Sequence, residues 1–257
     1  MRTTPGAALV TGATSGIGEA FARALPFPTS LLLTGRDEAA LTRLAAELGA
    51  GGRVVETMAA DLATDEGLDA VCAAAERLSV DLLICNAGVG PFGDFLSIDE
   101  AALRQTVSVN VTAPLVLTRR LLPGMIERAE AEGRRAGLIV VSSNAGFLPV
   151  PRLAAYAASK AFDLSLTEAL AAELTSRPVD VLALCPTATR SRFAERSGFG
   201  RTPPGAQRPG HVARSALAAL GRQRTLVLGP LSGSVLTAPA LVRASLAQAL
   251  HTVLPRR

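Results

Sequence analysis

The sequence predicts an α/β fold in which a doubly wound, mainly parallel sheet of seven strands carries helices on both faces. Short apolar runs alternate with longer helical patterns along the chain, and a glycine-rich turn joins the first run to the first helix. Polar motifs follow directly after several of the runs, where the carboxyl ends of parallel strands meet. The length of 257 residues suits a single domain over residues 1–257 with a full core.

The first expected strand is Ala7–Val10, and after a turn a helix begins near Glu19. The other expected strands are Ser30–Thr34, Arg53–Ala59, Asp81–Cys85, Gly137–Ser142, Val179–Leu184 and Thr225–Leu228. The helical patterns between them include Asp37–Leu48, Glu66–Leu78, Glu100–Leu122 and Ala154–Leu174. In the first of these, Leu41, Leu44 and Leu48 share one face. The polar run Glu127–Arg135 is expected to end a helix or extend it towards solvent.

Gly12, Gly16 and Gly18 punctuate the turn TGATSGIG with the spacing GxxxGxG. Glycine suits places where the backbone turns sharply, approaches a ligand or packs helix on strand. The helix N-terminus behind the turn offers free N–H groups and a positive dipole end to a pyrophosphate. A glycine-rich turn used only for folding remains the alternative. No Gly-Lys-Ser/Thr follows, which excludes a P-loop.

The chain contains one tyrosine and one lysine, Tyr156 and Lys160, in the run YAASK. Positions i and i+4 of a helix lie on the same face, so the ammonium can lie near the phenol and favour the phenolate. A tyrosine placed in this way can act as a general acid or base near neutral pH. The alternative is a surface lysine beside a half-buried tyrosine.

Taken in order, TGATSGIG, Asn86-Ala87-Gly88, Asn110, Ser142-Ser143 and YAASK resemble the short-chain dehydrogenase/reductase family in its single-domain form, from about Leu9 to Ser191. The resemblance implies a Rossmann-like fold and hydride transfer between a nicotinamide cofactor and a carbonyl or secondary alcohol. It implies that Tyr156 is the catalytic acid/base and that Lys160 also holds the nicotinamide ribose. Ser143, thirteen positions before the tyrosine, matches the carbonyl-polarising serine better than Ser142 does. Asn110 matches the family's helix asparagine, which would hold a water of a proton relay.

The same resemblance implies a set of cofactor contacts. They are Gly12, Thr14, Ser15, Gly16, Ile17, Gly18, Arg36, Asp61, Leu62, Asn86, Ala87, Gly88, Tyr156, Lys160, Pro186, Thr187, Thr189 and Ser191. Two departures stand out. Cys85 replaces an asparagine that the family often has, and Thr187 replaces a glycine after the sixth strand. The turn at Thr187 is in doubt because a β-branched residue resists positive φ.

The end of the second strand predicts a preference for NADP(H), with NAD(H) possible. Gly35 stands where an acidic residue would bind a ribose 2′-hydroxyl and repel a phosphate, and Arg36 follows it. A guanidinium there can pair bidentately with a 2′-phosphate. The alternative is that Arg36 is solvated while Asp37 caps the next helix.

A segment rich in Gly, Pro and Arg, residues 192–211, lies where the family's substrate lid sits (near 190–211). Apolar side chains expected around the substrate are Phe193, Phe199, Phe147, Leu148, Val150 and Phe92. We therefore expect an apolar or amphipathic ketone or secondary alcohol as substrate. Arg192, Arg196 or Arg201 could read an anionic group, with a solvated face as the alternative.

Composition excludes several other classes. Cys72, Cys85 and Cys185 lie in apolar stretches without metal-like spacing, which indicates buried thiols and no disulfide framework or metal site. His211 and His251 are too far apart in sequence to suggest a metal site. The net charge of +4 comes from scattered arginines without aromatic interleaving, so no nucleic-acid partner is expected. No apolar run is long enough to span a bilayer, and no signal peptide precedes the first strand, so a cytoplasmic protein is expected.

The tail near 231–257 is an extension with roughly helical apolar spacing. It is expected to pack over the substrate pocket or at a subunit interface, with a membrane-surface contact as the less favoured alternative. A homodimer or homotetramer follows from the family resemblance alone. The alternative function is a catalytically silent sensor or scaffold that binds NADP(H), which the presence of Ser143, Tyr156 and Lys160 disfavours.

Overall fold

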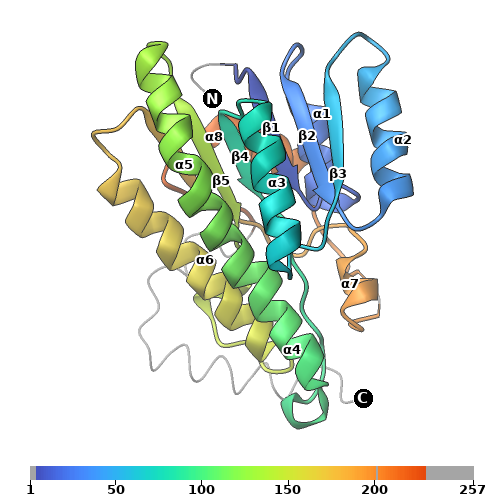
Figure 1. The fold of residues 1–257 in the computed structure, drawn as a ribbon. Helices are drawn as coiled ribbons and strands as arrows, with labels where there is room; N and C mark the ends of the chain where they lie inside the picture. The colour runs from blue at the N-terminus through green and yellow to red at the C-terminus, as the bar shows by residue number, and fades with distance from the viewer. Residues whose placement is uncertain (1–3, 201, 230–257) are drawn as a thin grey trace.

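A computed structural model describes residues 4–200 and 202–229. Its centre is a seven-stranded, all-parallel sheet in the order β3-β2-β1-β4-β5-β6-β7. Figure 1 shows the part of this order from β3 to β5. The strands are β1 Ala7–Thr11, β2 Ser30–Gly35, β3 Val55–Ala59, β4 Leu82–Cys85, β5 Ala136–Val141, β6 Val179–Cys185 and β7 Thr225–Val227. The order reverses direction between β1 and β4, which is the switch point where ligands bind in such sheets.

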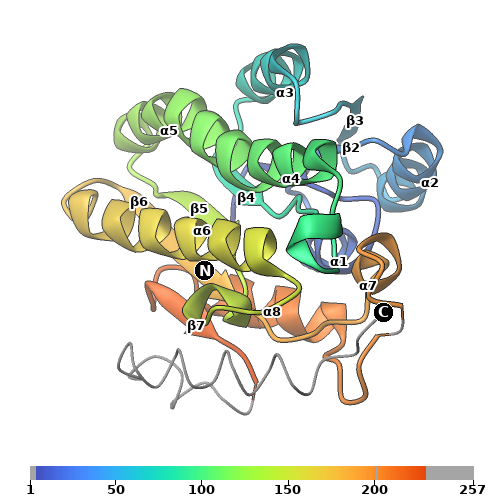
Figure 2. The ribbon, with the colours of Figure 1, turned by 90° about the horizontal axis from the view of Figure 1, so that it is seen from below.

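Helices cover both faces of the sheet (Figure 2). The α-helices are α1 Gly16–Ala24, α2 Glu38–Gly49, α3 Asp65–Arg77, α4 Glu100–Val107, α5 Ala113–Ala131, α6 Ala154–Glu173, α7 Phe193–Arg196 and α8 Pro209–Ala219. Single turns of 3-10 helix occur at η1 Phe95–Ser97 and η3 Asn144–Phe147, and a π-helical segment, η2, occupies Ser108–Thr112. The predicted Rossmann-like, doubly wound fold is confirmed.

Two apolar layers hold the sheet between the helices. Successive strand side chains point to opposite faces, so Leu9 of β1 packs with α3 and α5 while its neighbours Ala8 and Val10 pack with α1 and α8. Ala, Leu and Val make up most of both layers. Aromatic residues add little, and Phe21 of α1 is the one aromatic side chain among the largest fully buried residues of the described chain.

Most predicted elements are found within a residue or two of their expected bounds, but the long helix expected over Glu100–Leu122 is wrong in detail. It divides into α4, the π-helical segment η2 and α5. Pro114 lacks the N–H that an uninterrupted α-helix would use at this point, which explains the wider turn before it. The polar run Glu127–Arg135 does extend a helix, as far as Ala131.

Helices α7 and α8 were not among the predicted elements. Strand β3 begins at Val55, two residues after the predicted start, where its pairing with β2 begins opposite Leu31. The Arg53 side chain donates hydrogen bonds to the carbonyl oxygens of Leu25 and Pro26. The expected tail near 231–257 lies outside the described residues. No helix in the described ranges has the length and apolar character needed to cross a bilayer.

Candidate active site

A cleft of about 1310 Å³ opens along the carboxyl ends of the strands. It is lined by residues from both predicted groups, the cofactor contacts and the catalytic candidates. Of the predicted residues, the lining includes Gly12, Thr14, Ser15, Ile17, Arg36, Asp61, Leu62, Asn86, Ala87, Gly88, Ser143, Tyr156, Lys160, Pro186, Thr187, Thr189 and Ser191. Gly16, Gly18 and Asn110 do not line it and act on the cleft only through their neighbours.

The glycine-rich turn has the geometry that its glycines require. Gly12 and Gly16 have φ values of 65° and 60°, in the left-handed region. A Cβ on Gly18 would lie 2.2 Å from the carbonyl oxygen of Gly12, so this glycine permits close helix–strand packing. Ser15 is the N-cap of α1 but makes no capping hydrogen bond with its side chain. The N–H groups of the first turn therefore remain available to an anion in the cleft.

Asn86 holds this turn in place from the end of β4. Its side-chain amide donates to the carbonyl oxygens of Thr11 at 2.8 Å and Gly12 at 3.3 Å. The Thr11 hydroxyl in return accepts the backbone N–H groups of Asn86 and Ala87, both at 2.9 Å. The Asn86 side chain thus fixes the floor of the cleft.

Tyr156 lies in the first turn of α6, against the loop that follows β4. Its ring packs on Gly90, where a Cβ would come within 2.7 Å of the tyrosine Cδ2. Phe193 of α7 packs on the same ring with centroids 5.0 Å apart. Ser143 Oγ accepts the N–H of Ala145 at 3.1 Å, which leaves the hydroxyl proton free to donate into the cleft. A hydroxyl with a free proton and a phenol therefore line one cleft.

Lys160 is buried, with 4% of its surface exposed. Its ammonium donates to Val141 O at 2.8 Å and to Asp163 Oδ2 at 2.9 Å, and it lies 5.9 Å from the centre of the Tyr156 ring. Burial by itself lowers the pKa of the ammonium, but the charges of Asp163 and Tyr156 and the hydrogen bond to Asp163 outweigh burial and raise the Lys160 pKa. Lys160 is therefore a permanent cation at neutral pH.

Asn110 is completely buried in the π-helical segment. Its side-chain oxygen accepts Val89 N at 2.9 Å, and its amide donates to Val89 O at 2.7 Å and to Ser159 Oγ at 2.9 Å. Ser159 precedes Lys160 on α6, so Asn110 ties the loop after β4 to the helix that carries Tyr156 and Lys160. Both amide protons are used in these contacts, and the predicted water relay through Asn110 remains a prediction.

The opposite end of the cleft is cationic. Arg36 follows Gly35 at the end of β2, and Asp37 caps α2 by accepting Ala40 N at 3.0 Å. Arg192 donates to Thr14 O at 3.0 Å and lies 3.7 Å from Asp37. The pKa of Arg196 is lowered, first by burial and then by the neighbouring charges of Arg192 and Arg36. Three guanidinium groups therefore gather near this end.

Thr187, which replaces a glycine in the turn after β6, is not among the positive-φ residues of the described chain. The turn therefore places no backbone strain on this β-branched residue. Thr189 Oγ1 donates to Thr187 O at 2.9 Å, and Ser191 Oγ accepts Phe193 N at 3.2 Å. Ser191 also abuts the glycine-rich turn, since a Cβ on Gly16 would lie 2.7 Å from the serine Cβ. The segment thereby places α7 over the cleft.

The apolar wall differs from the expectation in two places. Phe193, Phe199, Leu148 and Val150 line the cleft, but Phe147 and Phe92 do not. Phe147 packs instead against the buried cluster of Leu164, Ala183 and Cys185. Phe92 supports the wall from behind through an edge-on contact with Phe199, with centroids 4.8 Å apart. Arg201 lies outside the described residues.

Two residues near the site were not predicted. Gly90 supports the Tyr156 ring, and Asp163 pairs with Lys160. The sequence did contain a signal for Asp163, because this acidic residue stands between two apolar residues, Phe162 and Leu164, one turn after the lysine. The three cysteines are buried free thiols, as expected, and no cluster suited to a metal ion occurs in the described part of the chain.

A family model for short chain dehydrogenases matches residues 6–199. The very-long-chain 3-oxoacyl-CoA reductase of Eremothecium gossypii is 36% identical over 226 residues, which cover 84% of this chain and 62% of that protein. The 2-(S)-hydroxypropyl-CoM dehydrogenase 3 of Xanthobacter autotrophicus is 34% identical over 180 residues, 69% of each chain. The chain thus spans less than two thirds of the length of the first relative and slightly more than two thirds of the length of the second.

Solved structures agree with these matches. A short-chain dehydrogenase from Sphingobium yanoikuyae in complex with NADPH superposes with a TM-score of 0.78 at 30% identity, covering 97% of this chain and 96% of that one. A short-chain dehydrogenase/reductase from Burkholderia phymatum in complex with NAD gives a TM-score of 0.79 at 27% identity, covering 91% and 93%. With the family model spanning most of its length, the chain belongs to the short-chain dehydrogenase/reductase family of oxidoreductases.

Proposed function

We propose that this chain transfers hydride between C4 of a nicotinamide cofactor, preferentially NADP(H), and the carbon of a ketone or secondary alcohol. The observation that carries the proposal is that Ser143, Tyr156 and Lys160 line the same cleft as the glycine-rich turn and Arg36. The cleft fits a dinucleotide because one end offers free helix N–H groups and guanidinium groups, and the other offers the polar groups for carbonyl chemistry.

The nicotinamide supplies the hydride, and the chain supplies the proton and the orientation. In reduction, Tyr156 donates its phenolic proton to the carbonyl oxygen, and Ser143 donates a hydrogen bond to the same oxygen. Lys160 places a positive charge beside Tyr156 and has a donor left for a ribose hydroxyl. Asn110 holds the loop and the helix in register through Val89 and Ser159.

The Tyr156→Phe variant tests this mechanism. We expect it to lose at least about a thousandfold in kcat with a good carbonyl substrate while binding NADPH normally, because only the proton donor is removed. Near wild-type turnover would refute the role of Tyr156. The silent-sensor alternative is not favoured, since the residues that turnover needs are all present in the cleft; it would require that no carbonyl compound is turned over by the wild-type chain.

The NADP(H) preference rests on the cationic end of the cleft. Arg36 can pair with a 2′-phosphate, and Asp37 is engaged as a helix cap that also lies near Arg192. We expect Arg36→Ala to weaken NADPH binding by about 10-fold to 100-fold and to leave NADH binding within about threefold. Arg43→Ala, which removes an exposed arginine from α2, is the charge-matched control. Equal losses for both cofactors in Arg36→Ala would refute the phosphate contact.

The substrate we propose is apolar or amphipathic. Within the segment that we propose as a substrate lid, Ser191 and residues 193–199 line the cleft. The short helix α7 contributes Phe193, and Phe199 and Leu148 add apolar surface. Names of similar proteins point the same way, since they include an acyl-CoA reductase and an alcohol dehydrogenase specific for bulky ketones. A ketone series of increasing chain length tests this: kcat/KM should rise with apolar size, and a flat series would contradict the proposal.

Assembly into a homodimer or homotetramer is also proposed. Val107 at the end of the short helix α4 and Leu115 in the first turn of the long helix α5 expose 52% and 41% of their surfaces. Mass measurement by light scattering after size-exclusion chromatography tests this. Charged substitutions at Val107 and Leu115 should shift an oligomer towards the monomer, and a wild-type monomer would contradict the proposal.

A further inference from the structure

Lys160 and Asp163 form a buried ion pair one turn apart on α6. The ammonium and the carboxylate are 2.9 Å apart, and their side chains are only 5% and 2% exposed. Every other ion pair in the described residues includes a side chain at least 30% exposed. Burying two charges costs free energy that a surface pair does not, so this pair is unusual in the molecule.

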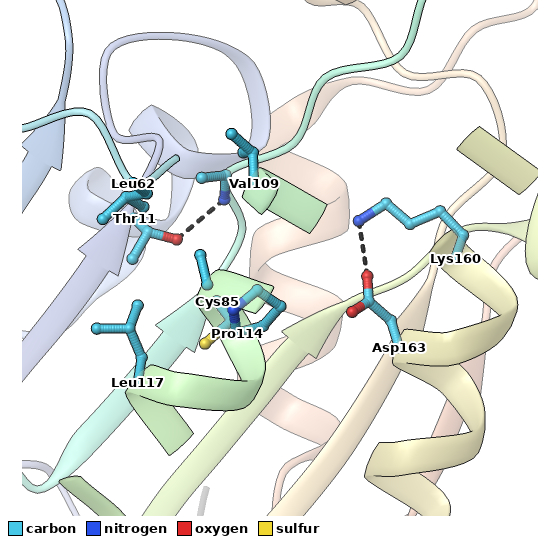
Figure 3. A pocket seen from close by; sticks show the side chains of 10 residues that line it. Thr11, Leu62, Cys85, Val109, Pro114, Leu117, Lys160 and Asp163 are labelled. Atoms are coloured by element: carbon cyan, nitrogen blue, oxygen red, sulfur yellow. Dashed lines mark hydrogen bonds and ion pairs between the residues drawn. The ribbon is translucent and has the colours of Figure 1, made fainter. Parts of the chain in front are cut away.

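Behind the pair lies a small cavity of about 10 Å³, close to the smallest volume that holds one water molecule (Figure 3). Lys160 lines both this cavity and the cleft, whereas Asp163 lines the cavity alone. Figure 3 shows the two side chains directed towards one another, with Cys85 and Pro114 on the opposite wall. The second carboxylate oxygen of Asp163 is buried and has no hydrogen-bond partner in the structure.

Two of the three ammonium donors of Lys160 are taken by acceptors within the protein. Val141 O takes one and Asp163 Oδ2 takes another, and an ammonium has three donors in total. One donor is left for a ligand. Without Asp163, a single backbone carbonyl would orient a flexible four-carbon side chain.

We propose that Asp163 is a positioning residue that fixes the Lys160 ammonium and, by its negative charge, sets the pH at which the Tyr156–Lys160 pair loses its first proton. The proposal rests on the proposed function of that pair. The carboxylate of Asp163 adds a second buried charge to the proposed site. The site then contains a paired anion and cation, whereas Lys160 alone would be a buried cation without a counter-ion.

The direction of the effect follows from the charges around the pair. The groups that interact electrostatically with Lys160 are Tyr156 and Asp163 on its own helix and Cys85 at the end of β4. Cys185 of β6 interacts with the same carboxylate, and so does Cys85. Burial raises the pKa of both thiols to about 12, so they stay neutral. Burial also raises the pKa of the Asp163 carboxyl, while the charge of Lys160 and its hydrogen bond oppose that rise. The ion pair with Lys160 therefore makes Asp163 the anion that acts on the pair. Glu168, exposed and further along α6, interacts with Cys185 but is not among the groups acting on Lys160.

A nearby anion makes proton loss harder for both a phenol and an ammonium. Because Tyr156 and Lys160 are coupled, the loss of the first proton is a property of the pair, whichever residue releases it. Removing the charge of Asp163 must therefore move that proton loss to lower pH. A residue with a merely structural role would not produce this shift.

Because the chain contains a single lysine and a single tyrosine, an NMR titration can follow each side chain separately. Lys160 is the one lysine and Tyr156 the one tyrosine, so lysine labelled at ¹³Cε and tyrosine labelled at ¹³Cζ each give a single side-chain NMR signal that needs no assignment. In the Asp163→Asn variant, which keeps the shape of the side chain, we expect the first titration of the pair to fall by about one to two pH units relative to wild type. Glu168→Gln removes a negative charge from the exposed face of the same helix and should leave both signals unchanged.

An unchanged titration in Asp163→Asn would overturn the proposal, and so would an equal shift in Glu168→Gln. If Asp163→Asn does not fold, the wild-type chain still decides: a Lys160 signal that titrates below the ordinary lysine value of about 10.4 contradicts a stabilising anion. The pH dependence of alcohol oxidation provides the second readout, with its midpoint falling by the same amount as the NMR midpoint. Were Tyr156→Phe to keep full turnover, the proposed mechanism would fail while the Lys160 titration still tested the Asp163 pair.

Discussion

The ring of Tyr156 lies directly on the α-carbon of Gly90, and no side chain fits between them. A Cβ at Gly90 would lie 2.7 Å from Tyr156 Cδ2 and 2.8 Å from its Cβ, distances that require one of the two residues to move. Gly90 belongs to the loop that Asn110 ties down through Val89. The loop therefore fixes the ring of Tyr156 from one side while Phe193 contacts it from another.

Gly90→Ala should accordingly displace the Tyr156 ring and lower kcat by about 10-fold to 100-fold, because small displacements of a catalytic group are costly. NADPH binding should change much less, since the glycine-rich turn is untouched. Gly93→Ala is the matched control in the same loop, because its added Cβ would meet only Ile98 Cγ1 at 3.6 Å, an ordinary contact. Steady-state kinetics with direct cofactor titration measures both; equal kcat values for the two variants would contradict a tight Gly90–Tyr156 contact.

Removing both charges of the buried Lys160–Asp163 pair should be less harmful to stability than removing one, but it should not restore turnover. Lys160→Met leaves the Asp163 carboxylate buried without its cation and should lower the free energy of unfolding by about 3 kcal/mol or more. Adding Asp163→Leu removes the stranded charge and should recover most of that loss. Urea unfolding of the two variants tests this, and turnover should remain abolished in both. A double variant no more stable than Lys160→Met would show that the two charges do not interact as the geometry indicates.

The buried thiols predict how stability responds to alkali. Burial raises the pKa of Cys85 and Cys185 to about 12, above the ordinary value of 9.0. The unfolded chain releases these protons near pH 9 while the folded chain retains them, so the thiol contribution is fully present below pH 9.0 and is lost as pH rises towards 12. The free energy of unfolding should fall over this window.

A Cys85→Ala, Cys185→Ala double variant isolates this contribution, since its unfolding free energy should depend less steeply on pH above 9.0. Below that pH the slopes of the two proteins should coincide. Urea unfolding at several pH values measures both slopes. Identical slopes throughout would mean that the thiols ionise as readily in the folded chain as in the unfolded one.

Much of the fold was predictable because short stretches of the sequence carry the signals for its strands and helices. Several strands of this sheet are short apolar runs that end at a glycine or a polar residue, as at Gly35 and Asn86, and such signals do not depend on distant contacts. The divided helix around Asn110 was missed because a π-helical turn has no periodicity of its own over five residues. Helix α7 was missed because four residues make a single turn, too short for an apolar face to recur.

The site was predictable wherever a motif fixes both a residue and its spacing, as for Tyr156 and Lys160. It was not predictable where a residue acts through the fold. Gly90 matters because a ring from a distant helix packs on it, and Phe147 does not line the cleft because it packs against the buried cluster of Leu164, Ala183 and Cys185. Asp163 shows the limit most clearly, since only burial turns an acidic residue on a helix into the partner of Lys160.

Gly18 of α1 and Gly49 of α2 are both helical glycines, but their surroundings differ. A Cβ on Gly18 would lie 2.2 Å from the carbonyl oxygen of Gly12 and 2.5 Å from Asn86 Nδ2, in the backbone of the turn itself. Gly18→Ala should therefore push α1 away from β1 and lower the free energy of unfolding by about 2 to 3 kcal/mol. NADPH binding should weaken with it, because the first-turn N–H groups of α1 would no longer face the cleft.

Gly49→Ala is the contrasting substitution, at the last residue of α2, where an added Cβ meets nothing within 4 Å. It should raise the free energy of unfolding by about 0.5 to 1 kcal/mol, since alanine restricts the unfolded chain and favours the helix. Urea unfolding of both variants, with NADPH titration of each, separates the two effects. Should Gly18→Ala prove as stable as wild type with unchanged NADPH affinity, the close contact between the helix and the turn would not be needed for either the fold or the cofactor site.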